Sequence, residues 1–224
     1  DGLRPRDGAS DDVRAAPPLD YLRFVFLPLL AKLGLEVKLT LVRRGYYPRG
    51  GGEIEIEVQP GRAQGLRLET PGPLQEIAGI AHVANLPAHI AERMQHAARE
   101  VLVAYPQTRI EEQVLGRDEA IGPGGAIVLW ARTAHSVLGG AAVAQRGVPA
   151  EQIGADAARA LLVELAAGAA LDVHAADQIL IYLAQAQGAS TFAVRELSLH
   201  ARSTLWLLQQ FLPLRAQTST HNGL

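Results

Sequence analysis

Two runs of alternating side chains enclose a glycine-rich segment, and they constrain the fold more than any other feature of the chain. In the first run, residues 35–41, aliphatic side chains alternate with Glu36, Lys38 and Thr40. In the second run, residues 53–58, glutamates alternate with isoleucine and valine. A period of two residues is typical of a strand with one buried face. Because the linking segment GYYPRGGG is rich in turn-forming residues, the two runs are predicted to form an antiparallel hairpin.

The three consecutive glycines of this segment, residues 50–52, allow two interpretations. A phosphate-binding loop needs a lysine, a serine or threonine, and a following helix whose N-terminus receives the anion. The glycine run has none of these and leads into the second alternating run. The GPGG sequence at 122–125 fails the same test. We therefore interpret both as turns, in which glycine tolerates positive φ.

Periodicities outside the hairpin indicate a mixed α+β fold. Apolar residues recur at helical spacing from Leu22 to Leu33, and Gly34 is placed to end that helix. Its apolar side is predicted to face a sheet. Pro149 is expected in the first turn of a later helix. The remaining elements are predicted as strands at 77–86, 108–115, 125–132, 136–144 and 190–197, and as helices at 87–103, 149–167, 173–187 and 202–211.

A composition change at residues 60–73, where glycine and proline are frequent, marks a boundary. Beyond it, strands and helices follow one another closely as far as the GAALD sequence, after which a helix, a strand and a final helix are expected. We therefore predict a large α+β domain, residues 1–72 and 169–224, that is interrupted by a smaller α/β domain, residues 73–168.

Composition limits the functions that are open to the chain. Of its 224 residues, 48% are hydrophobic and 20% are charged, which predicts a globular protein. The net charge of -2 excludes a global positive field for nucleic acid or anionic lipid. The absence of cysteine excludes disulfides and a thiol nucleophile, and fits the cytoplasm, where we expect the protein. No apolar run is long enough to span a membrane, and the chain, which begins without methionine, looks partial.

Residues 172–187 carry a cluster of polar side chains on an otherwise apolar helix. Asp172 is a candidate N-cap, and His174, Asp177 and Gln178 stand at i, i+3 and i+4, so they share one face. Such a set of donors and acceptors suits recognition of a base or ribose. The alternative from the pattern alone is a solvated first turn.

His200 is the second candidate site residue. It is expected between a strand end and a helix start, with Ser203 and Thr204 available to cap the helix. A neutral imidazole is a nucleophile or general base near neutral pH, and an anion bound there meets the positive end of the helix dipole. The alternative is an ordinary polar loop residue. His89 and His96 are seven residues apart on the helix expected at 87–103, with no acidic residue that completes a metal constellation, so they are interpreted as a solvated face and no metal-ligating residue is predicted.

Four segments, in their order and spacing, resemble the RNA 3′-terminal phosphate cyclases. They are AAPPLDYLRFVFLPLLAKLG, RRGYYPRGGGEIEIEV, HAADQILIYLAQAQG and LHARSTLWLLQQFLP, and the resemblance runs from about residue 10 to about residue 213. It implies a large domain of repeated βαβαββ-like units, similar to the C-terminal domain of translation initiation factor three, with a thioredoxin-like insert. It also implies a ligase that uses ATP and a divalent metal, Mg²⁺ or Mn²⁺, to convert an RNA 3′-phosphate to a 2′,3′-cyclic phosphate.

The resemblance assigns roles to particular residues. The position of His200 matches the family histidine that attacks the α-phosphorus of ATP and becomes a covalent histidine-AMP. AMP then passes to the RNA 3′-phosphate, and the neighbouring 2′-hydroxyl closes the ring and releases AMP. Residues His174, Ala175, Ala176, Asp177 and Gln178 match the family's ATP-binding helix.

Further features of the resemblance concern the N-terminal side of the chain. Pro17 matches a proline that packs near the adenine. Family members carry a further repeat upstream, with residues that serve ATP, metal and phosphates. The chain alone is therefore expected to be weakly active or inactive.

Arg43, Arg44 and Arg49 are candidates for phosphate contacts, but solvated arginines beside a hairpin are the interpretation that we adopt.

Two alternatives to the enzyme stay open. A non-catalytic branch of the family acts in ribosome assembly as a binding protein, and it shares the glycine signature while lacking the nucleophilic histidine. The presence of His200 favours the enzyme. The second alternative is an inactive remnant of a longer protein. The sequence does not identify the physiological RNA, the preferred metal or the oligomeric state.

Overall fold

The computed structural model describes residue 12 and residues 16–220 of the chain. The described part is a mixed α+β structure, as predicted. Its elements, in chain order, are α1 (Leu19–Tyr21), the π-helical turn η1 (Leu22–Phe26), α2 (Leu27–Lys32), β1 (Val37–Arg43), β2 (Glu53–Val58), β3 (Arg67–Leu68), β4 (Leu74–Ala84), α3 (His89–Val101), β5 (Arg109–Leu115), β6 (Gly124–Thr133), β7 (Val137–Val143), α4 (Ala150–Ala166), α5 (Val173–Leu183), β8 (Thr191–Phe192) and α6 (Leu199–Phe211).

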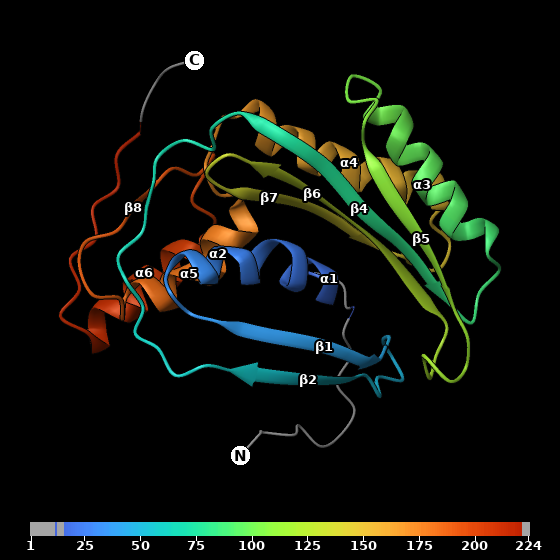
Figure 1. The fold of residues 1–224 in the computed structure, drawn as a ribbon, viewed down its shortest axis with the longest axis horizontal. Coiled ribbons are helices and arrows are strands. Elements are labelled where there is room, and N and C mark those ends of the chain that lie inside the picture. Colours follow the sequence, from blue (N-terminus) through green and yellow to red (C-terminus); the bar gives the residue numbers. More distant parts are fainter. Residues whose placement is uncertain (1–11, 13–15, 221–224) are drawn as a thin grey trace.

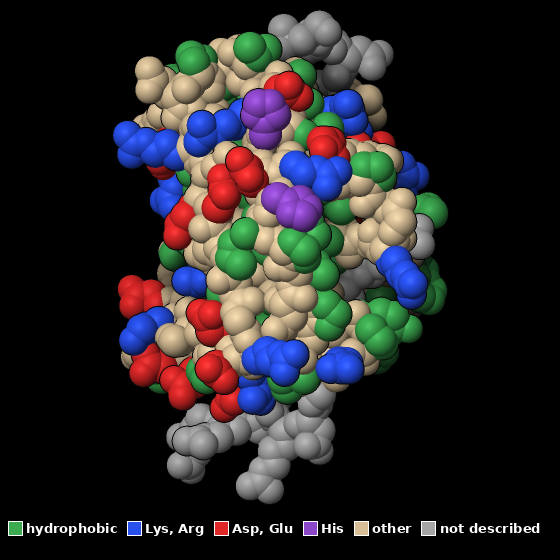
Figure 2. Space-filling view, turned by 90° about the vertical axis from the view of Figure 1, so that its right-hand side faces the viewer, with side chains coloured by type: hydrophobic (Ala, Val, Ile, Leu, Met, Phe, Trp, Pro, Cys, Tyr) green, Lys and Arg blue, Asp and Glu red, His purple; other side chains and the backbone are tan. Residues whose placement is uncertain are grey.

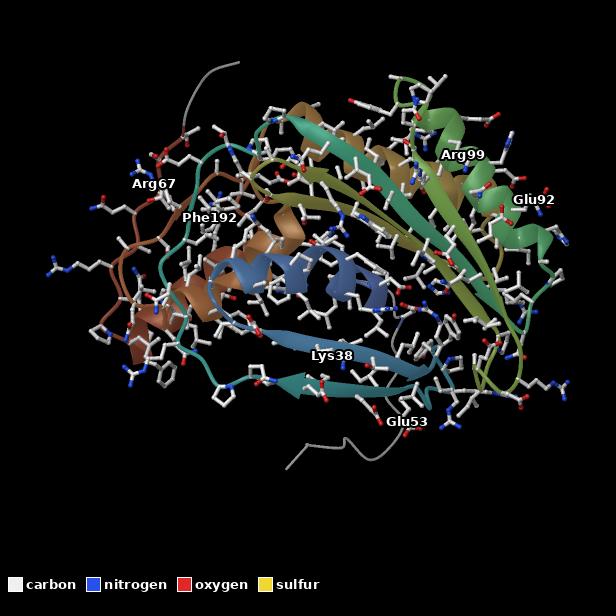
Figure 3. The ribbon with its side chains drawn as sticks, viewed as in Figure 1. Lys38, Glu53, Arg67, Glu92, Arg99 and Phe192 are labelled. Carbon is white, nitrogen blue, oxygen red and sulfur yellow. The ribbon has the colours of Figure 1, made fainter. Side chains whose placement is uncertain are left out.

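The elements form layers (Figure 1). Helices α3 and α4 cover one face of a four-stranded sheet, and the α1–η1–α2 segment lies between the opposite face and the β1–β2 hairpin. Helix α5 belongs to the same inner layer, and α6 packs against α5. Arg67 and Phe192, from β3 and β8, lie at one end of the molecule, whereas Glu92 and Arg99, from α3, lie at the other (Figure 3).

The four-stranded sheet has the order β5-β4-β6-β7, with β4 and β5 parallel and the other neighbours antiparallel. Successive side chains of β4 point to opposite faces of the sheet, and each face packs into a separate hydrophobic core. Ile77 and Val83 face α3 and α4, whereas Ala78 and Ile80 face the inner helical layer. The core around α3 and α4 is built entirely within residues 74–166, which we call the four-stranded unit.

The predicted hairpin is confirmed. Strands β1 and β2 pair antiparallel, with Leu39 opposite Ile56, and the connecting loop has positive φ at Gly50 and Gly51. The predicted helix at residues 22–33 is also confirmed, and Gly34 ends it with φ 78°. Glycine is favoured at these positions because a side chain there strains the backbone.

Three predicted boundaries after residue 172 are wrong. Helix α5 ends at Leu183 rather than at residue 187. Strand β8 contains only Thr191 and Phe192, because these are the two residues that pair with its partner strand β3. Helix α6 begins at Leu199 rather than at residue 202, because Ser198 caps it. His200 therefore lies inside the first turn of a helix and not in a loop.

Chain segments on either side of the four-stranded unit pair with each other. Strands β3 and β8 are parallel, and Gln64 bridges Gln187 just before them. Leu171 bridges Val194 and donates its N–H to the carbonyl of Ala193 at 3.1 Å. The segment before the four-stranded unit and the segment after it therefore lie side by side. The exact domain bounds stay a prediction.

The glycine-rich hairpin loop packs against the β5–β6 connection of the four-stranded unit. The Arg44 N–H donates to the carbonyl of Glu119 at 2.8 Å. A Cβ added to Gly124 would overlap the ring of Tyr46, which is buried. The two glycine sequences, GYYPRGGG and GPGG, therefore meet in space, and Gly124 has no side chain because Tyr46 occupies that volume.

A cluster of buried polar side chains lies beside this contact. The Arg44 guanidinium donates from Nη2 to Asp20 Oδ2 at 2.5 Å, and its Nη1 lies 3.6 Å from Asp12 Oδ2. The Nε2 atom of His82 lies 3.5 Å from Asp12 Oδ2 and 3.6 Å from Asp20 Oδ2. The Tyr46 hydroxyl is 2.9 Å from His82 Nδ1. The interpretation of Arg44 as a solvated arginine is thus wrong, because it neutralises two buried carboxylates.

The contact between Tyr46 and Gly124 predicts the effect of a single added methyl group. Gly124→Ala should lower the free energy of unfolding by about 1–3 kcal/mol, because the buried ring has to shift. Gly116→Ala is the matched control, since the nearest atom to its added Cβ is Glu119 Oε2 at 3.9 Å. Urea denaturation measures both. Equal stability of the two variants would contradict the close packing.

The buried His82 predicts a pH dependence of stability. Burial, together with the positive charge of Arg44, lowers the pKa of His82 well below its usual value of 6.5. The unfolded chain binds a proton near pH 6.5, whereas the folded chain does not, so stability is lost as the pH falls below that value. The loss amounts to at most about 1.4 kcal/mol per pH unit.

Urea denaturation between pH 7.5 and about pH 5 tests this dependence. The His82→Gln variant should lose less stability on acidification than the parent chain, whereas His96→Gln, at an exposed position, should behave like the parent. An unchanged acid slope in His82→Gln would show that His82 is not held neutral.

Candidate functional site

The first turn of α5 is organised by a buried carboxylate. Asp172 is the N-cap, as predicted, and its Oδ1 accepts from the N–H of Ala175 at 2.9 Å. The same oxygen accepts from the hydroxyl of Tyr21 at 2.5 Å, and Oδ2 accepts from the N–H of Gly139 at 2.9 Å. Asp172 therefore joins α5 to α1 and to β7. Burial raises the pKa of Asp172, and these donors oppose that rise.

The predicted polar face lies along the accessible side of α5. His174 is exposed, and its ring meets the ring of Tyr21 edge-on, with centroids 6.3 Å apart. Asp177 and Gln178 are half-buried. Ala175 and Ala176 are buried and pack against the core, so the accessible surface of this turn comes from its polar side chains. The turn thus presents one imidazole, one carboxylate and one amide together.

His200 is the second residue of α6, and its side chain is exposed. Ser198 is the N-cap, and its Oγ accepts from the N–H of Ala201 at 2.9 Å. The proposed caps Ser203 and Thr204 are wrong, because both lie within the helix. His200 stands beside the free N–H groups that begin every α-helix, so it is close to the positive end of the dipole.

A direct hydrogen bond joins the two predicted site segments. The hydroxyl of Ser198 donates to Asp177 Oδ1 at 2.5 Å, across 21 positions of the sequence. Asp177 lies on the polar face of α5, and Ser198 lies two residues before His200. The structure therefore places the N-terminal turn of α6 against the first turns of α5.

Several residues of this region were missed by the sequence analysis. Glu164, at the end of α4, is buried and accepts from Arg195 Nε at 3.3 Å and from Arg195 Nη2 at 3.1 Å. Burial raises the pKa of Glu164, whereas Arg195 opposes the rise. Ser198 could have been found as a capping residue ahead of an apolar helix. Nothing in the local sequence indicates the contacts of Tyr21 or Glu164.

Pro17 lies two residues before α1 and is half-buried. It connects to the site through the chain, because α1 carries Tyr21, which contacts Asp172 and His174.

Two shallow hollows, of about 380 and 370 Å³, lie along α2 and are lined by residues that include Pro28 and Ala31. Neither is lined by residues of α5 or α6, so neither coincides with the predicted site.

The described residues show neither a metal cage nor a membrane span. No group of three or more histidine, aspartate or glutamate side chains among them is arranged to hold a metal ion. No helix among them is long and apolar enough to cross a bilayer. On the face shown in Figure 2, basic and acidic side chains occur side by side, in keeping with the near-neutral net charge.

Comparisons with known proteins bear on this arrangement. A family model described as RNA 3′-terminal phosphate cyclase matches residues 8–218. A protein of Nitrosospira multiformis named RNA 3′-terminal phosphate cyclase is 51% identical over 218 residues, which cover 97% of this chain and 62% of the relative. A protein of Pyrobaculum neutrophilum with the same name is 42% identical over 206 residues, covering 91% of this chain and 59% of the relative.

The match includes the hairpin loop, α5 and α6, so it covers both segments of the candidate site. The chain belongs to the RNA 3′-terminal phosphate cyclase family. It spans about three-fifths of the length of the relatives described above.

The three hydrogen bonds of Asp172 predict a large loss of stability in Asp172→Ala. The change removes the cap of α5 and leaves the Tyr21 hydroxyl and the Gly139 N–H buried without an acceptor. The free energy of unfolding should fall by about 3 kcal/mol or more. Asp156→Ala, at an exposed position on α4, should cost less than about 0.5 kcal/mol. Urea denaturation that gives equal losses would contradict the role of Asp172.

Proposed function

We propose that this chain supplies the nucleophile and the nucleotide-binding helix of an RNA 3′-terminal phosphate cyclase. The reaction is the ATP-dependent conversion of an RNA 3′-terminal phosphate to a 2′,3′-cyclic phosphate. The observation that carries the proposal is the Ser198–Asp177 hydrogen bond, because it brings the turn with His200 against the helix face with Asp177 and Gln178. Family membership and the names of the relatives support the reaction class.

In the proposed first step, the imidazole of His200 attacks the α-phosphorus of ATP. A phosphorus–nitrogen bond forms, and the bond between the α-phosphorus and the pyrophosphate oxygen breaks. ATP is consumed, so it is a co-substrate. The exposed position of His200 gives access to the phosphorus, and the N-terminal N–H groups of α6 stabilise negative charge that develops there.

In the later steps, AMP moves to the RNA and the ring closes. An oxygen of the RNA 3′-phosphate attacks the α-phosphorus and releases the nitrogen of His200. The neighbouring 2′-hydroxyl then attacks the activated RNA phosphorus, loses its proton, and expels AMP. Activation is needed because a phosphate monoester has a poor leaving group, whereas the anhydride has a good one.

The first turns of α5 are the proposed nucleotide contact. Gln178 and the second oxygen of Asp177 are available for the ribose or adenine, since Oδ1 of Asp177 is used by Ser198. His174 contributes an exposed imidazole, and Ala175 and Ala176, which belong to the same proposed ATP-binding helix, pack this turn against the core. Pro17 is proposed to pack near the adenine. A buried Asp172 keeps this turn in place through three hydrogen bonds.

The described residues contain no cluster of ligands that could hold the divalent metal of the proposed reaction, Mg²⁺ or Mn²⁺. We therefore assign no step to it through this chain.

The family also suggests a finer description of the fold. The sheet order β5-β4-β6-β7, with a parallel pair at one edge, supports a thioredoxin-like insert at residues 73–168, and family membership supports a surrounding domain of repeated units.

Transfer of label from ATP tests the proposed function. A chimera would join this chain to the part of the Nitrosospira multiformis relative that it does not match. With ATP labelled at the α-phosphate, we expect a covalent protein adduct, and with RNA that ends in a 3′-phosphate we expect a cyclic end. His200→Ala should lower both by at least about 100-fold, because the attacking nitrogen is lost. The chain without the added part should label weakly.

The matched control is His96→Ala, which removes an exposed imidazole from α3. It should leave both products at the parent level. Labelling that survives His200→Ala would exclude His200 as the nucleophile. RNA binding without any labelling would instead favour a non-catalytic binding protein.

A further inference from the structure

The segment that leads into α6 is fixed from two directions. On one side, Ser198 is bound to Asp177 of α5. On the other side, Arg195 is bound to Glu164 at the end of α4. Strand β8 comes just before this segment and contains only Thr191 and Phe192. Backbone hydrogen bonds hold the chain as far as Ala193 and Val194, and the side-chain contacts of Arg195 and Ser198 hold the rest of the approach to His200.

The hydroxyl of Ser198 makes two hydrogen bonds in opposite senses. As an acceptor it takes the N–H of Ala201 at 2.9 Å, which starts α6 at Leu199. As a donor it makes a hydrogen bond to Asp177 Oδ1, with the two oxygens 2.5 Å apart. A hydroxyl has one proton and two lone pairs, so both bonds are compatible. One small group thus links the start of the histidine helix to the nucleotide helix.

We propose that Ser198 and Asp177 are positioning residues that orient His200 toward a nucleotide held on α5. The proposal rests on the proposed function, in which His200 is the nucleophile. It also gives Asp177 a role that does not depend on ligand contact, because its Oδ1 faces a protein hydroxyl. Capping alone is not sufficient, since a cap fixes α6 internally but does not fix α6 relative to α5.

Orientation matters because in-line attack needs the imidazole nitrogen close to the α-phosphorus and aligned with the leaving oxygen. His200 is exposed, so few contacts of its own side chain fix its direction. Its direction is therefore set by the helix turn that carries it, and that turn is anchored to α5 by Ser198. Loss of this anchor should slow attack without removing the nucleophile.

Single-turnover labelling tests the proposal, using the chain and the chimera with α-labelled ATP. Ser198→Ala should lower the rate constant of labelling by about 10- to 100-fold. The final labelled fraction and the ATP concentration that gives half the maximal rate should stay near the parent values. A merely unfolded fraction would lower the labelled fraction instead, so the two effects are separable.

Two variants separate capping from the contact with Asp177. Ser198→Asp retains an N-cap acceptor for Ala201 but has no proton to donate to Asp177, so it should be as slow as Ser198→Ala. Ser198→Thr retains the hydroxyl and should label within about 3-fold of the parent. Ser203→Ala, an exposed serine on the same helix, is the matched control and should label at the parent rate.

A double-mutant cycle adds an independent test. If the two side chains act through one hydrogen bond, Ser198→Ala combined with Asp177→Ala should label no more slowly than Asp177→Ala alone. Parent-like labelling by Ser198→Asp, or additive effects in the cycle, would overturn the positioning role while His200→Ala still abolishes labelling. Labelling that is insensitive to His200→Ala would overturn the proposed function, and the positioning role with it.

Discussion

The buried carboxylate of Asp172 is the interaction on which the arrangement of the site depends. It accepts hydrogen bonds from the hydroxyl of Tyr21, the backbone of Gly139 and the backbone of Ala175, so three elements are joined at one point. A carboxylate at this depth is costly unless its lone pairs are satisfied, and here three donors satisfy them. The polar face of α5 therefore has a fixed place relative to the four-stranded sheet. Helix α6 takes its place from α5 in turn, through Ser198 and Asp177.

Local patterns allowed most of the elements to be predicted. The hairpin follows from strict alternation in residues 35–41 and 53–58, and the cap at Asp172 follows from a short polar residue ahead of an apolar helix. The start of α6 was misplaced because the preceding strand was predicted to extend to residue 197, whereas its ladder ends at Phe192 and Ser198 already caps the helix. Burial of Arg44 could not be predicted, since its carboxylate partners lie far from it in sequence.

The candidate site was predicted unevenly for the same reason. His200 and the polar face of α5 were found as candidates from the local pattern, and the family resemblance assigned their roles, whereas their neighbours were not found at all. Glu164 reaches Arg195 across 31 positions, and Ser198 reaches Asp177 across 21. Such contacts depend on how helices pack, and no periodicity of a single segment encodes them. The glycine-rich loop shows the converse, because its pattern is distinctive while its role is to pack against the β5–β6 connection.

The contact between Tyr21 and Asp172 joins positions that are 151 residues apart. Ribosomes synthesise roughly 5–20 residues per second, so Tyr21 emerges on the order of ten seconds before its acceptor exists. During that interval the apolar side of the first helical segment, including Val25 and Leu29, lacks the core residues that α5 contributes later, Ala175, Ala176 and Ile179. Because this first helical segment packs against core residues that are far away in sequence, the chain should fold slowly, and the segment should complete its packing only after α5 has been made.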